Sequence, residues 1–123
     1  MKKAKIFGVL FALISVIIGA LNSHALKKIL PETDIESIEV SSRYMMYHGL
    51  GLILISILSL KEKKYVVNFF IIGTILFSFS ILVLSFQPIV NINFSWLGPV
   101  TPIGGSLLII GWILLFYSLI REK

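Results

Sequence analysis

The chain has 123 residues, of which 57% are hydrophobic and only 14% are charged, and its formal net charge is +5. Soluble domains are about 45–50% apolar and about 25% charged, so this composition excludes an ordinary soluble domain and favours an integral membrane protein. The absence of cysteine excludes disulfides, thiolate metal ligands and thiol catalysis. The basic residues flank apolar stretches, so they indicate membrane topology and not nucleic-acid binding.

The first apolar stretch follows three lysines and predicts a membrane span over about residues 6–26. A signal peptide is the alternative, because residues 23–25 resemble a cleavage site, but the apolar run is at the upper length limit for such peptides. We therefore expect the span to be retained. Small residues recur along it at helical spacing and predict a stripe where another backbone approaches closely. They are Gly8, Ala12, Ser15 and Gly19.

An acidic segment leads from this span into the second apolar stretch. Thr33 and Glu36 form a capping-box pattern, which predicts that a helix begins near residue 33 or 34. We expect this helix to continue without a break into a second span over residues 44–60. Glu39 and Arg43 are four residues apart, so they are expected to pair on the surface of that helix.

The third span is predicted over residues 65–86, after a charged turn at residues 61–64. Its glycine, serine and threonine residues are typical of helix packing in membranes. The uncharged segment 87–102 is rich in proline and asparagine, which predicts a loop.

The fourth span is predicted over residues 103–120, with Pro102 at the first helical position. Gly104, Gly111 and Ser118 recur every seven residues, which predicts a second stripe for close helix packing.

The distribution of lysine and arginine predicts the orientation of these spans. Four spans place both termini and the middle turn on one side, and that side carries eight of the eleven basic residues. By the positive-inside rule, that side is cytoplasmic. The sequence therefore predicts an all-α, integral membrane four-helix bundle that crosses the membrane several times, with both termini cytoplasmic.

A histidine inside the second span is the most unusual feature of the sequence. Ionisable side chains are rare in membrane spans and mark candidate functional sites. The predicted topology brings this residue near other polar groups at the outer face, and we expect His24 and His48 to approach each other there, directly or through Tyr44. A straight second helix would instead separate them by nearly two turns. The candidate ligand-binding residues are His24, Lys27, Lys28, Arg43, Tyr44, Tyr47, His48 and Thr101.

Two classes of function stay open for this outer-face cluster. One is a non-catalytic binding or accessory protein in the lipid bilayer that recognises an anionic lipid, a quinone or another membrane subunit. The alternative is a small membrane carrier or enzyme that uses the same cluster. Neither a metal site nor a cofactor is predicted, because a metal needs three or four converging ligands. A purely structural role is also possible, with His24, Tyr44, His48 and Gln87 hydrogen-bonded to one another to fix the bundle.

Motifs along nearly the whole chain resemble the YgdD family. These are four-span proteins of bacterial inner membranes, grouped under a domain of unknown function, with a mitochondrial-associated relative in animals. The resemblance implies the fold and the location but no activity. It departs at residues 19–24, where the chain has GALNSH and the family usually has GAFGAH. The motifs that carry it are NSHALKK at 22–28, RYMMYHGLGL at 43–52, LFS at 76–78, and TPIGG at 101–105 followed by Gly111 and Trp112.

Overall fold

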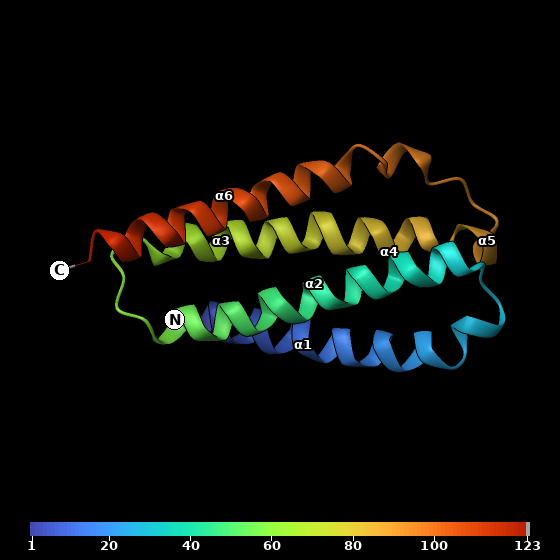
Figure 1. Ribbon diagram of the computed structural model, residues 1–123, viewed down its shortest axis with the longest axis horizontal. Helices are drawn as coiled ribbons and strands as arrows, with labels where there is room; N and C mark the ends of the chain where they lie inside the picture. Colours follow the sequence, from blue (N-terminus) through green and yellow to red (C-terminus); the bar gives the residue numbers. More distant parts are fainter. Residues whose placement is uncertain (123) are drawn as a thin grey trace.

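The computed structural model describes residues 1–122, which form helices and turns without any strand in this range. The all-α class is therefore confirmed. In Figure 1 the long helical segments lie alongside one another, and both ends of the chain lie toward the same end of the molecule. These segments are α1 (Lys2–Ser23), α2 (Glu32–Ile57), α3 (Lys63–Thr74), which continues through the π-helical turn η2 (Ile75–Phe79) into α4 (Ser80–Ser85), and α6 (Val100–Ile120).

Three helical stretches are long and apolar enough to cross a membrane. They are Lys2–Lys28, Lys63–Ser85 and Ser95–Ile120. The first contains α1 and the 3₁₀ helix η1 (Leu26–Lys28), and the last contains the 3₁₀ helix η3 (Ser95–Leu97) and α6. Helix α2 is not among them because its first half carries acids and an arginine, and its uninterrupted apolar part is shorter than the ~20 residues that a span needs.

Helix α2 begins differently from the prediction but continues as predicted. Its N-cap is Pro31, and no side chain caps it, so the predicted capping box is wrong. Proline presets the backbone angle for a helix start and its missing N–H needs no partner there, so Pro31 sets the boundary in place of Thr33. The carbonyl of Thr33 accepts a hydrogen bond from the Ser37 hydroxyl at 3.0 Å. The helix then runs to Ile57 without a break, as expected.

The connector before the last helix contains more structure than the predicted loop. It holds the short helix α5 (Gln87–Val90) and η3, and the Gln87 side-chain oxygen accepts the Phe94 N–H at 2.6 Å. Helix α6 begins at Val100 with Pro99 as its N-cap. The prediction that Pro102 opens this helix is wrong, because proline is tolerated throughout the first helical turn, whose N–H groups have no partner inside the helix.

Glycines bring neighbouring helices into direct contact. A Cβ added to Gly8 of α1 would lie 2.6 Å from the carbonyl oxygen of Gly49 in α2. On α6, a Cβ added to Gly104 would overlap the backbone of Phe77, and one added to Gly111 would lie 2.7 Å from the ring of Phe70. The small-residue stripes predicted on the first and last spans are confirmed at these positions.

The helices form an open bundle. Helix α1 packs along α2, helix α6 packs along α3 and η2, and α2 joins the two pairs through its contacts with α3, η2 and α4. Figure 1 shows α1 and α6 on the two flanks of the molecule. The outward faces of these two helices expose large aliphatic and aromatic side chains, which suits lipid contact.

Candidate functional site

The register between α1 and α2 determines how far apart the two histidines lie. Contacts recur every seven residues along this antiparallel pair. They join Gly8 with Gly49, Ser15 with Ser42, and Asn22 with Ile35. His24 is therefore level with residue 33 of α2, fifteen residues from His48, which corresponds to about 22 Å of helix. The predicted approach of the two histidines is wrong because α2 is one continuous helix and does not bend onto the membrane surface.

His48 is buried among aromatic side chains, with only 3% of its surface exposed. About 24 Å of helix separates it from the start of α2 and about 14 Å from the end, so it lies closer to the end of the molecule that carries both termini. Its ring packs edge-on against Phe70 at 5.1 Å between centroids and against Trp112 at 5.8 Å, and it stacks on Tyr44 at 6.0 Å. The predicted single cluster at the outer face is therefore wrong.

Both ring nitrogens of His48 have hydrogen-bond partners inside the protein. The indole N–H of Trp112 donates to Nε2 at 3.0 Å, and Nδ1 lies 2.8 Å from the backbone carbonyl oxygen of Tyr44. Since an indole nitrogen can only donate, Nε2 must accept, and the proton of the neutral ring is on Nδ1. This arrangement joins α2 to α6 and leaves neither nitrogen free for a ligand.

The tyrosines and Thr101 also take structural positions. Tyr44 packs against Phe77 at 4.9 Å, and the half-exposed Tyr47 lies edge-on to Tyr44. The Thr101 hydroxyl lies 2.6 Å from that of Ser80 and links α6 to α4. Gln87 donates to the Leu84 carbonyl in α4 and accepts the Phe94 N–H of the connector, so the predicted polar network that included it is wrong.

Paired hydroxyl groups connect successive helices, a feature that the sequence analysis missed. Ser15 of α1 and Ser42 of α2 each donate to the other's carbonyl oxygen, at 2.7 and 2.9 Å. Ser41 of α2 and Ser78 of η2 do the same at 2.8 and 3.1 Å. Serines within spans were the available signal, but the sequence does not reveal which of them face one another.

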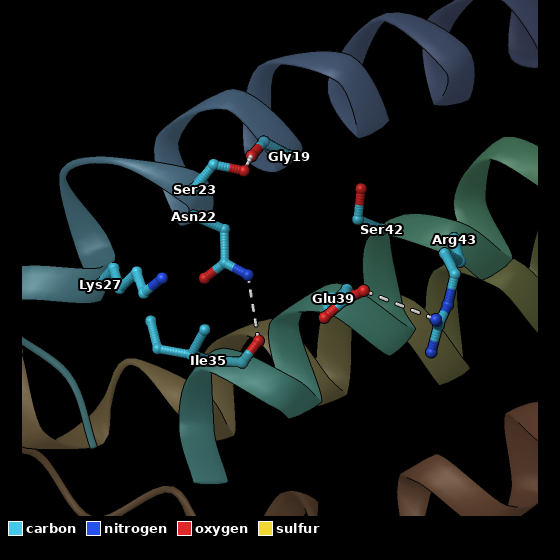
Figure 2. A pocket seen from close by; sticks show the side chains of 8 residues that line it. All are labelled: Gly19, Asn22, Ser23, Lys27, Ile35, Glu39, Ser42 and Arg43. Carbon is cyan, nitrogen blue, oxygen red and sulfur yellow. Dashed lines mark hydrogen bonds and ion pairs between the residues drawn. The ribbon is translucent and has the colours of Figure 1, made fainter. Parts of the chain in front are cut away.

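A groove between the end of α1 and the first half of α2 contains two of the four remaining candidate residues. Its volume is about 340 Å³. Of the predicted ligand-binding residues, Lys27 and Arg43 line it. Figure 2 shows the eight lining residues: Gly19, Asn22, Ser23, Lys27, Ile35, Glu39, Ser42 and Arg43.

The charges of the groove are partly paired. Arg43 forms an ion pair with Glu39 at 3.5 Å, as predicted, and both side chains are more than half exposed. Lys27 is exposed in η1 and supplies a second positive charge. His24 and Lys28 are also exposed but are not among the lining residues, so the structure does not bring them into this group.

Asn22 is the one buried polar side chain of the groove with an unused acceptor among the described residues. Only 6% of the residue is exposed. Its amide nitrogen donates to the backbone oxygen of Ile35 at 3.0 Å, whereas its Oδ1 atom has no hydrogen-bond partner within residues 1–122. In Figure 2 this oxygen is turned toward the side of the groove on which Lys27 lies. A buried carbonyl oxygen without a donor is costly, so the groove offers a hydrogen-bonding position to a ligand.

Comparisons with known proteins agree with a membrane protein. A family model described as protein of unknown function (DUF423) matches residues 18–105. A UPF0382 membrane protein, SH2409, from Staphylococcus haemolyticus is 37% identical over 122 residues, covering 96% of this chain and 95% of the relative. The UPF0382 membrane protein YwdK from Bacillus subtilis is 32% identical over 128 residues, covering 98% of each. No solved structure matches the chain.

Proposed function

The chain belongs to the DUF423 family of membrane proteins of unknown function, and on that premise we propose that it is a non-catalytic binding protein of the plasma membrane. Its ligand is the headgroup of an anionic phospholipid, held in the groove between α1 and α2. The observation that carries this proposal is the groove itself, which combines two basic side chains with polar groups at the end of an apolar helix.

The proposal includes the topology of a four-span inner-membrane protein, in keeping with the resemblance to the YgdD family. The apolar part of α2 is short for a span, but the helix has 26 residues and packs along the 22-residue α1, which supports its crossing the membrane beside α1. The excess of lysine and arginine near the termini and the middle turn supports cytoplasmic termini. The groove then opens at the outer surface, where lipid headgroups lie.

Single-cysteine labelling tests this topology directly because the natural chain has no cysteine. We expect a membrane-impermeant maleimide added to intact cells to label Lys28→Cys but not Lys61→Cys. After the membrane is permeabilised, both variants should react. Labelling of Lys61→Cys in intact cells would contradict the orientation.

The lining chemistry favours an anionic headgroup over the other ligands considered. Lys27 and Arg43 together exceed the single negative charge of Glu39, so the groove has a net positive charge. Guanidinium and ammonium groups are common partners of phosphate oxygens. The volume, about 340 Å³, is at the small end of ligand sites and suits a headgroup better than a whole lipid.

A quinone or a catalytic role has less support. Both nitrogens of His48 are already hydrogen-bonded, so that residue offers no free donor to a quinone carbonyl and no free base to a reaction. A carrier or enzyme that depends on one cluster at the outer face would need the two histidines together, and they lie about 22 Å apart along the helices.

Native mass spectrometry of the protein purified in mild detergent tests the lipid proposal. The wild type should retain an anionic phospholipid, and the double variant Lys27→Gln/Arg43→Gln should retain at least tenfold less, because charge-assisted hydrogen bonds are worth about 1.5–3 kcal/mol each. Lys28→Gln is the matched control, since Lys28 is the next residue of η1 and does not line the groove. An equal loss in the control would mean that surface charge, and not the groove, holds the lipid.

A further inference from the structure

We propose that the groove selects an anionic phosphodiester headgroup that also carries a hydroxyl, as in phosphatidylglycerol. This inference rests on the proposed function, because it names the class of lipid that the same groove takes. The observation behind it is the oxygen of Asn22, which is buried at the groove without a donor among residues 1–122.

The amide nitrogen and the amide oxygen of Asn22 differ in their hydrogen bonding. The amide nitrogen is committed to the Ile35 carbonyl, which fixes the side chain between α1 and α2. The opposite end is an acceptor only, so it cannot bind a phosphate oxygen and requires a group that donates a hydrogen. Thr74 also has a buried oxygen without a partner, but it lies in α3 and does not line the groove. Asn22 is therefore the residue that adds selectivity beyond charge.

In this proposal the phosphate and the hydroxyl of the headgroup bind different residues of the groove. Lys27 and Arg43 supply the positive charge that a phosphodiester needs, and Lys27 is exposed. The Asn22 oxygen is turned toward the side of the groove on which Lys27 lies, so a headgroup held by Lys27 would be on the same side as that oxygen (Figure 2). The net positive lining favours an anionic lipid over a zwitterionic lipid with an ammonium donor, because the ammonium would meet both cations.

A matched pair of lipids isolates the hydroxyl. Phosphatidylglycerol and phosphatidylethanol are both anionic phosphodiesters with the same acyl chains, but the second has no headgroup hydroxyl. We expect wild-type protein in nanodiscs or mild detergent to retain phosphatidylglycerol about fivefold or more over phosphatidylethanol, the ratio that one hydrogen bond to a buried acceptor supplies. Native mass spectrometry of an equimolar lipid mixture measures this ratio.

The variant Asn22→Leu tests the residue. Leucine is similar in size but cannot accept a hydrogen bond, so the ratio should fall to about one, whereas Lys28→Gln should keep the wild-type ratio. A loss of affinity for both lipids with an unchanged ratio would assign Asn22 a purely structural role and overturn the inference. The wild-type ratio needs no variant, so it decides the question even if Asn22→Leu does not fold.

The outcomes separate this inference from the proposed function. Equal retention of both lipids, lost in Lys27→Gln/Arg43→Gln, would overturn the hydroxyl selectivity and leave the lipid site in place. Retention of neither lipid would overturn both. A soluble glycerol phosphodiester is the third arm: if it displaces the lipid at equimolar concentration, the ligand is a soluble phosphodiester and the lipid assignment is wrong.

Discussion

The pairing of α1 with α2 differs from the pairing of α6 with α3 in what fills the contact. Gly8 and Gly49 meet backbone to backbone, and the next contact along this seam is the reciprocal pair Ser15 and Ser42. On α6, by contrast, Gly111 receives the ring of Phe70. Both helix pairs approach closely at glycines, but the first seam continues as a polar contact whereas the second is filled at Gly111 by an aromatic side chain.

This difference bears on the proposed binding site. The α1–α2 seam continues as polar side chains to the end of α1, where it opens into the groove at Asn22. Around His48 the aromatic rings pack against one another, and the Trp112 N–H donates to the His48 ring. That region is therefore packed like a protein core. Small residues thus allow close approach in both pairs, and the polar seam leads into the groove at Asn22.

The largest expected effect comes from filling a glycine contact. Gly104→Ala should lower the free energy of unfolding by about 2–3 kcal/mol, because its methyl group would overlap the backbone of Phe77, which cannot move without shifting a helix. The neighbouring Gly105→Ala is the control. Its added Cβ would lie 3.4 Å from the Phe77 ring, an ordinary contact, so this variant should be neutral or slightly stabilising. Thermal unfolding in detergent compares the two, and equal stability would mean that the α6 contact is looser than the structure shows.

The next effect concerns the bond between α2 and α6. Trp112→Phe keeps the aromatic contact but removes the N–H that His48 accepts, which leaves a buried nitrogen unpaired. We expect a loss of about 1–3 kcal/mol in unfolding free energy. The double variant His48→Leu/Trp112→Phe should recover part of this loss, since removing both partners leaves no unsatisfied group. If the double variant loses as much as the sum of the single variants, the two residues are not coupled.

The sequence predicted those features that depend on local spacing. The stripe through Gly8 and the Glu39–Arg43 pair follow from three- and four-residue periodicity, and the structure confirms both. The continuous helix through residue 42 also follows, because no proline or glycine interrupts it. The apolar composition was enough to predict an α-helical membrane protein.

Features that depend on register between helices were not predictable in the same way. His48 was assigned to the outer face because the apolar run starts near residue 44. Helix α2 begins earlier, at Glu32, so His48 lies further along the helix than the start of the apolar run suggested. The partner of His48 is Trp112, which is 64 residues away in sequence, and no local pattern identifies it. For the same reason the role of Asn22 was missed, since its unused oxygen becomes visible only when α2 is placed beside α1.

A smaller effect is expected from the hydroxyl pair between α2 and η2. Ser41→Ala and Ser78→Ala each remove one of the two reciprocal bonds. Hydrogen bonds between membrane helices average about 0.6 kcal/mol, so each variant should lose about that amount. Each hydroxyl donates to the backbone carbonyl of the other serine, which an alanine keeps, so the two losses should add in the double variant. A double-mutant cycle measured by unfolding in bicelles checks this. Because the serines also bring the helices close, losses near zero in both single variants would show that their small size matters more than their hydroxyls.

Glu39→Gln is expected to have the smallest effect on stability and to increase the binding of the proposed lipid. The ion pair with Arg43 is more than half exposed, and such pairs contribute about 0.2–1 kcal/mol, so the unfolding free energy should hardly change. Within the groove, however, the carboxylate neutralises the arginine that the proposed phosphate needs. Its removal should therefore increase retention of anionic phospholipid in native mass spectra, most clearly at low salt, where surface charges are least screened.

Glu36→Gln controls for the general loss of a negative charge, since Glu36 is on the same helix but not in the groove. Reduced lipid retention in Glu39→Gln would mean that the pair orients Arg43 for its ligand instead of competing with it. That result would make the α1–α2 seam a preorganised site whose ion pair must stay intact when the ligand binds.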